Sequence, residues 1–252
     1  MPELLFSRIL NGILAGPVTA LLHLVGIQPA HPDAPIPDHV AMQFLLVIVL
    51  TMLFLILRSQ LSVENPGGLQ HVMEGAYNFV GTLGQEIIGH DYSDFLPYLL
   101  TLGIFILSAN LMGLVPGLES PTAKPVVPLG CALVTWFYYQ TQGIRKNGPI
   151  GYLKHFIGPQ DSSIPLIVRL ILPVLMFPIE IFSHLARLLS LTVRLFANMF
   201  AGEMVTLVFF SLVPIGIPII FEGLHIGVSF IQTYIFVLLA CVYLGEATAH
   251  EH

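Results

Sequence analysis

Two apolar stretches fill most of the C-terminal half of this chain, at residues 164–212 and 218–247. A helix rises about 1.5 Å per residue, so the proline-free run from Ile179 to Phe210 would be about 48 Å long. The hydrocarbon core of a bilayer is only about 30 Å thick. A helix of that length stays within the membrane only if it is steeply tilted. We therefore expect a hairpin of two long, strongly tilted helices.

The composition excludes a soluble domain, because 55% of the 252 residues are hydrophobic and only 10% are charged. Soluble domains carry about 25% charged residues. The apolar runs are too long and too unbroken for the alternating strands of an outer-membrane barrel. Three shorter runs, at 41–58, 96–115 and 126–141, add to the two long stretches. The sequence therefore predicts an all-α, polytopic membrane protein with about five membrane segments.

Residues 66–90 have a different pattern, in which apolar side chains recur at helical spacing without forming a long run. These side chains are Leu69, Val72, Met73, Ala76, Phe79, Val80 and Leu83. Such a segment is typical of an amphipathic helix that lies on the membrane surface.

The first 40 residues are set apart from the rest by a Pro-rich linker at 28–39. We expect an interfacial N-terminal helix before this linker. A signal peptide is the alternative, which Glu3 and the polar or helix-breaking residues Asn11, Gly12 and Pro17 disfavour. The sequence thus divides into an N-terminal segment, 1–40, and a single membrane domain, 41–252.

The Lys and Arg residues of short loops indicate the orientation. Loop 142–163 contains Arg145, Lys146 and Lys154, whereas the outward-facing turn 116–125 contains Lys124. We therefore place loop 142–163 and the C-terminus in the cytoplasm and the N-terminus outside, in a multi-pass membrane protein.

One arginine, Arg194, lies in the middle of an apolar run. A guanidinium at bilayer depth costs about 2.5–3.5 kcal/mol on insertion scales, and it stays protonated there. No carboxylate lies one helical turn away in the sequence. A charge kept at this cost favours a role in attracting or repelling another charge inside the membrane.

Other polar residues share faces of the two long helices. Glu180, Arg187 and Arg194 recur every seven residues, with His184, Ser190 and Asn198 between or beside them. On the second helix, one face carries Glu222, His225, Ser229 and Gln232. Glu203 is expected to face roughly away from Arg194. Glu203, Glu222 and His225 all lie toward the turn that joins the two helices.

These groups suggest two proton paths that end at Arg194. Desolvated Glu203, Glu222 and His225 can exchange protons near neutral pH and could line an outer path. Glu180, His184 and Ser190 could line an inner one. Structural alternatives remain open: Arg187 can pair with Glu180 or lie at the interface, His184 can serve as a helix–helix hydrogen bond, and Glu222 can be simply exposed.

Several functions are excluded by what the sequence lacks. It has no nucleotide-binding or hydrolase motif, so we expect no catalytic site of its own. The net charge of −6 argues against nucleic-acid binding. Cys131 and Cys241 lie in apolar runs and suggest buried residues, so we expect no metal and no cofactor.

The segment SLTVRLFANMFAGE, at 190–203, resembles the signature of subunit a of the F-type ATP synthase. The likeness extends to SANLMGLVP at 108–116, to PGGLQHVMEGAYNFV and to the C-terminal LHIGVSFIQTYIFVLLACVYLGEATAHEH. The chain departs from the family pattern at Ala123-Lys124-Pro125, near the expected outer mouth of the channel.

The resemblance implies a proton-translocating stator subunit whose proton path lies within 166–247. Arg194 would face the carboxylates of the c-subunit ring and separate two offset half-channels. Asn198, Glu203, His225 and Gln232 would belong to the outer path and the support of Arg194, and Glu180 and Ser190 to the inner path. The implied partners are the c ring, b-type peripheral stalk subunits, the lipid membrane and the translocated H⁺.

Two other functions compete with this one. A stand-alone cation/proton antiporter would pair Arg194 with a carboxylate of its own chain, but such transporters have internal repeats that this sequence lacks. A purely structural membrane scaffold would leave two single-face polar stripes without a purpose.

Overall fold

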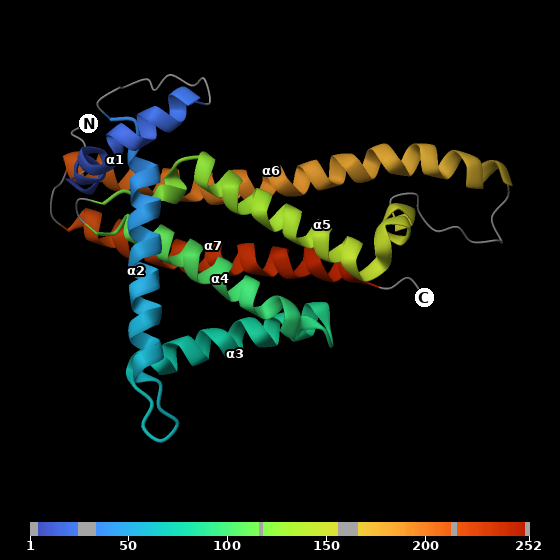
Figure 1. Ribbon diagram of the computed structural model, residues 1–252, viewed down its shortest axis with the longest axis horizontal. Helices are drawn as coiled ribbons and strands as arrows, with labels where there is room; N and C mark the ends of the chain where they lie inside the picture. Colours follow the sequence, from blue (N-terminus) through green and yellow to red (C-terminus); the bar gives the residue numbers. More distant parts are fainter. Residues whose placement is uncertain (1–4, 25–33, 116–117, 156–165, 213–215, 250–252) are drawn as a thin grey trace.

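The computed structural model describes residues 5–24, 34–115, 118–155, 166–212 and 216–249, and within them it is helical with no strand (Figure 1). The prediction of an all-α, polytopic membrane protein is confirmed. The other stretches include most of the Pro-rich linker, the end of the expected loop 142–163 and the turn of the C-terminal hairpin, so the expectations for those parts lie outside the described residues.

Four helices in the described ranges are long and apolar enough to cross a membrane. They are α2 (Asp38–Gln60), α4 (Tyr92–Met112), α6 (Leu166–Leu212) and α7 (Ile217–Thr248). The fifth expected segment, 126–141, is the beginning of α5 (Val126–His155). By length and composition α5 is not among the candidate spans. Its aromatic and amide residues, from Trp136 to Gln142, make it less apolar than the run of Val and Leu at its start suggests.

The two C-terminal helices form the expected hairpin. α6 has 47 residues and α7 has 32, so they are about 70 Å and 48 Å long. α6 continues upstream of the predicted proline-free run, through Pro178 and Pro173. The two helices lie side by side along the longest axis of the molecule and cross α2 steeply (Figure 1).

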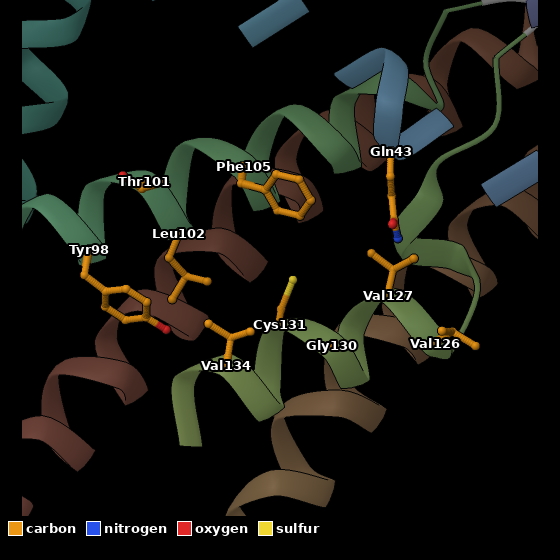
Figure 2. Close-up of a pocket in the computed structure, with 10 residues that line it drawn as sticks. All are labelled: Gln43, Tyr98, Thr101, Leu102, Phe105, Val126, Val127, Gly130, Cys131 and Val134. Carbon is orange, nitrogen blue, oxygen red and sulfur yellow. The ribbon is translucent and has the colours of Figure 1, made fainter. Parts of the chain in front are cut away.

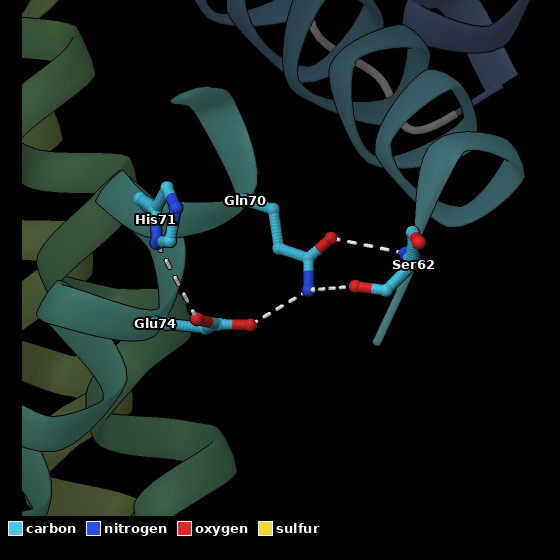
Figure 3. Close-up of polar contacts among 4 residues, drawn as sticks. All are labelled: Ser62, Gln70, His71 and Glu74. Atoms are coloured by element: carbon cyan, nitrogen blue, oxygen red, sulfur yellow. Dashed lines mark hydrogen bonds and ion pairs between the residues drawn. The ribbon is translucent and has the colours of Figure 1, made fainter. Parts of the chain in front are cut away.

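The expected amphipathic helix is α3 (Gly68–Ile88), which packs against α4 and α7. Its buried face carries Val80 and Leu83, whereas Val72 and Phe79 are exposed. Gln70 fixes the corner with α2: its amide accepts a hydrogen bond from the Ser62 backbone nitrogen and donates to Ser62 O, both at 3.1 Å (Figure 3). The same amide group donates to Glu74 at 2.7 Å. After this corner, α3 runs at a steep angle to α2 (Figure 1).

The core lies where α4, α5, α6 and α7 meet. Its fully buried members include Leu99, Ile106, Leu195, Phe236 and Leu244. A 3₁₀ turn, Pro121–Ala123, is buried in the connection from α4 to α5 and contacts α6. At the N-terminus, α1 (Leu5–Leu24) packs on α2, and the Asn11 side chain exchanges two hydrogen bonds with the backbone of Ile36. The core therefore supports the hairpin from one side and leaves much of the surface of α6 exposed.

Candidate functional site

Arg194 is half-buried on α6, within the long apolar helix. Its Nη2 lies 3.4 Å from the Ser190 hydroxyl, one turn earlier. In the described ranges, no carboxylate forms a salt bridge with it. Within the part of the chain that the structure describes, the guanidinium therefore carries its charge without an ionic partner.

A direct hydrogen bond joins the two helices beside Arg194. The Asn198 side chain donates to Gln232 Oε1 at 2.6 Å. Gln232 is 2% exposed, and Asn198 is one turn after Arg194 on the same helix. Ser229, on the same stripe, donates its hydroxyl hydrogen bond to the backbone oxygen of His225 on its own helix. The bond between Asn198 and Gln232 thus fixes the register of the hairpin at the level of the arginine.

His225 packs directly against the backbone of α6 at Gly202. A Cβ added to Gly202 would lie 2.6 Å from His225 Nδ1, closer than any real contact of that kind. The ring is 6% exposed, and its Nε2 has no hydrogen-bond partner among the described atoms. Only a glycine at position 202 leaves room for the imidazole where it now lies.

A cavity of about 230 Å³ lies on one side of His225. Its walls bring together Glu203, Glu222 and His225, the three residues that the sequence assigned to an outer path. They also include Glu119 and Lys124 from the connection between α4 and α5, which sequence reasoning did not assign to the path. The cavity therefore gathers five ionisable side chains at the end of the hairpin near its turn.

A second cavity, of about 260 Å³, lies between α6 and α7. Its lining includes His225, Gly202 and Asn198. His225 thus belongs to the walls of both cavities. The first cavity holds the ionisable cluster, and the second reaches Asn198. Asn198 lies one turn from Arg194 and is bonded to Gln232, so the two cavities extend from the cluster to a point beside Arg194.

Glu203 is held by the connection between α4 and α5. Its Oε1 accepts a hydrogen bond from the Ser120 backbone nitrogen at 3.0 Å, across 83 residues of sequence. The Ser120 hydroxyl contacts that of Thr122 at 2.7 Å, and Thr122 donates to Asn110 Oδ1 at 2.7 Å. The sequence pattern did not predict this hydrogen-bond network, because Ser120, Thr122 and Asn110 lie in a short turn and in a helix far from the hairpin in sequence. The network positions the Glu203 carboxylate at the cavity wall.

Glu180 and His184 lie at the opposite end of the hairpin and contact each other. His184 Nε2 is 3.6 Å from Glu180 Oε1, and its Nδ1 is 2.9 Å from the Tyr139 hydroxyl on α5. Tyr139 and His184 are both buried, whereas Glu180 is partly exposed. The structure therefore gives His184 the helix–helix hydrogen bond that was one of its two expected roles. It leaves the role of Glu180 in an inner path untested.

Arg187 does not pair with Glu180, which was one of the two structural alternatives left open for it. Its Nη1 lies 2.6 Å from Glu246 Oε2, and its guanidinium lies over the ring of Tyr243, 4.9 Å from the centroid. Glu246 lies in the last turn of α7, which continues to Thr248. Because the two helices run antiparallel, the pair links this end of α7 to the middle of α6.

We expect a charge exchange to test this link. Arg187→Glu alone places two carboxylates together and should lower the free energy of unfolding by about 1 kcal/mol, because the like charges repel and the ion pair is lost. The double variant Arg187→Glu with Glu246→Arg should recover most of this free energy. Thermal unfolding of the chain in detergent micelles measures both changes. A double variant as impaired as the single one would show that the ion pair does not matter.

The family model and the most similar known proteins all indicate the same family. The model of the ATP synthase A chain family matches residues 40–245. The chain is 57% identical over 250 residues to ATP synthase subunit a of Koribacter versatilis, covering 99% of this chain and 98% of that protein. It is 49% identical over 243 residues to ATP synthase subunit a of Solibacter usitatus, covering 96% and 99%. It is 39% identical over 216 residues to that of a Sulfurihydrogenibium species, covering 85% and 99%.

Proposed function

Because the chain belongs to the ATP synthase subunit a family, we propose that it carries protons through the membrane to a ring of c subunits, with Arg194 as the charge that separates two half-channels. The observation that carries this proposal is an arginine within a long apolar helix that has no carboxylate partner among the described residues. Its counter-charge then comes from another polypeptide. A mobile ring carboxylate fulfils that need and can also carry a proton around the arginine.

The outer half-channel follows the two cavities. Protons enter the cluster of Glu119, Glu203 and Glu222, pass His225 and reach the space beside Asn198. Glutamate and histidine side chains are suited to this role. Desolvation generally raises the pKa of a carboxyl group toward 7, and the usual pKa of a histidine side chain is already close to 7. Gln232 supports the path by holding Asn198.

The inner half-channel begins on the opposite side of Arg194. Ser190 and Glu180 lie on the same face of α6, one and four turns before the arginine. A direct jump between the half-channels is disfavoured, because a proton that approaches a fixed cation in a low dielectric is strongly repelled. The passage through the membrane therefore requires the ring to turn.

The tilt of the hairpin fits this arrangement. If α2 stands across the bilayer, α6 and α7 lie steeply inclined and can follow the curved surface of a ring. The segment that was expected to be a loop, 142–163, continues α5 as a helix as far as His155. This segment and the C-terminus face the cytoplasm, b-type peripheral stalk subunits hold the chain still, and the catalytic chemistry belongs to other subunits. A stand-alone antiporter is disfavoured, since it would need its own carboxylate opposite Arg194.

Site-specific crosslinking tests the proposal. Ala197 is exposed on α6, one turn from Arg194. In a chain whose Cys131 and Cys241 are replaced by alanine, Ala197→Cys should form a disulfide with a cysteine placed beside the ring carboxylate. Val49→Cys, equally exposed on α2, is the matched control and should form none. A ring that reacts with Val49→Cys and not with Ala197→Cys would refute the proposed interface.

A further inference from the structure

Thr206, on α6, differs from the other helical threonines in the use of its hydroxyl. Every other threonine of the α-helices, within the described residues, donates its side-chain hydrogen bond to the backbone oxygen four residues earlier. Thr192, on the same helix, does so to the oxygen of Leu188 at 2.8 Å. This local bond is a common choice of a threonine inside a helix. The buried Thr206 Oγ1 has no hydrogen-bond partner among the described atoms.

The buried side-chain atoms without a partner gather at the outer cavity. In the described part of the chain there are three, and two of them, Thr206 Oγ1 and His225 Nε2, belong to residues on the wall of the 230 Å³ cavity. The third is Asn110 Nδ2, in the network that holds Glu203. A buried polar atom without a partner is destabilising, and native proteins keep few of them. Their common location therefore indicates a function of this cavity.

The packing of the hairpin places Thr206 at the level of Glu222. The imidazole of His225 contacts α6 at Gly202. Thr206 lies one turn beyond Gly202, and Glu222 lies one turn before His225. Because α6 and α7 are antiparallel, both residues lie one turn closer to the end of the hairpin than this contact. The two side chains line the same cavity from the two helices.

A larger cavity, of about 510 Å³ and lined mostly by α4 and α5, has a different arrangement (Figure 2). Two hydroxyl groups belong to its lining, and both are used within the protein. Tyr98 donates to Thr135 at 2.9 Å, and Thr101 donates to the backbone oxygen of Pro97 at 2.7 Å. A cavity between these helices therefore does not by itself leave a hydroxyl without a partner.

A hydroxyl that is not bonded to its own helix can relay protons. It has one donor hydrogen and two acceptor lone pairs. When the hydrogen is bonded to a backbone carbonyl, the group can accept a hydrogen bond but has no proton to pass on. The Thr206 hydroxyl has both capacities. In a concerted transfer, its oxygen takes up one proton as its own proton leaves for the next acceptor, so the side chain stays neutral.

We propose that Thr206 is a further member of the outer proton path, where its hydroxyl passes protons from Glu222 to Glu203 and His225 through water in the cavity. The cavity has room for several water molecules, which take about 30 Å³ each, and its ionisable walls can hold them. Glu203 lies three residues before Thr206, on the same face of α6 and one turn deeper. This inference rests on the proposed proton transport and adds a neutral relay to it.

Two substitutions of opposite kind test the relay. Thr206→Val keeps the shape of the side chain and removes the hydroxyl, so ATP-driven acidification of inverted vesicles should fall about threefold to tenfold. Thr206→Ser keeps the hydroxyl and removes the methyl group, and it should stay within about twofold of the wild type. A packing role predicts the reverse order. Thr192→Val is the matched control on the same helix and should transport as the wild type does.

Two outcomes would overturn the relay. One is wild-type transport by an assembled Thr206→Val complex, with assembly verified by copurification of the subunits. The other is a Thr206→Ser complex as impaired as Thr206→Val. Arg194→Ala, assayed in parallel, distinguishes this failure from that of the proposed function. Transport that survives Arg194→Ala would reject both, whereas transport that is lost there and normal in Thr206→Val would reject the relay alone.

Thiol labelling tests the location of Thr206 independently of transport. In the assembled complex with Cys131 and Cys241 replaced by alanine, Thr206→Cys should react with a small, water-soluble methanethiosulfonate at least about tenfold faster than Thr192→Cys. The reason is that water in the outer cavity reaches position 206, whereas Thr192 is buried and bonded to its own helix. Equal or slower labelling at position 206 would overturn the proposal.

Discussion

Arg194→Ala should abolish proton-driven ATP synthesis while the chain still inserts and assembles. A charge-assisted hydrogen bond contributes about 1.5–3 kcal/mol, and the upper value corresponds to a factor of roughly 100. Because Arg194 has no ionic partner among the described residues, its removal leaves none of their carboxylates without a salt bridge that it had before. The expected loss is therefore in function and not in folding.

The measurement has two parts, because the arginine has two proposed tasks. ATP synthesis by vesicles under an imposed proton gradient reports the attraction of ring carboxylates. Passive proton leak, measured without nucleotide, reports the electrostatic block between the half-channels. We expect the alanine variant to lose the first and to increase the second, since the repelling charge is gone.

Arg194→Lys separates these tasks. It keeps the charge and should keep the leak low, but it loses the planar fork that binds a carboxylate through two nitrogens, so synthesis should remain strongly impaired. Val193→Ala, at the exposed neighbour, is the control and should behave as the wild type. Normal synthesis in an assembled Arg194→Ala complex would exclude the proposed role.

The sequence predicted the elements of the hairpin well, because the lengths of apolar runs and helical periodicity are local properties. The stripe through Glu180, Arg187 and Arg194 and the stripe through His225 and Gln232 follow from a repeat of 3.6 residues. Periodicity indicates which residues share a face.

Periodicity does not indicate what that face meets. Arg187 shares a face with Glu180, yet it binds Glu246, because the far end of α7 returns to it. Glu203 meets Ser120 from a connection 83 residues away, which no repeat in the sequence encodes. Such contacts depend on how helices pack in three dimensions. The same limit applies to α5, which packs against both long helices although its composition does not qualify it as a span.

Gly202→Ala should strongly reduce transport through the outer half-channel. In a helix, replacing glycine by alanine is normally favourable by up to about 1 kcal/mol. Here the new Cβ would lie 2.6 Å from His225 Nδ1 and 3.0 Å from Cε1, so the ring must move. Since His225 lies between the two cavities, its displacement interrupts the connection between Glu203 and Asn198.

We expect a reduction of about tenfold or more in ATP-driven acidification, corresponding to at least roughly 1.4 kcal/mol on the rate-limiting transfer. Gly75→Ala, on α3, is the matched control, because nothing lies within 4 Å of its added Cβ. Gly202→Ala combined with His225→Ala separates obstruction from loss of the imidazole. The double variant should transport no worse than His225→Ala alone, because no ring remains to be displaced. Additive losses in the double variant would mean that Gly202 acts independently of His225.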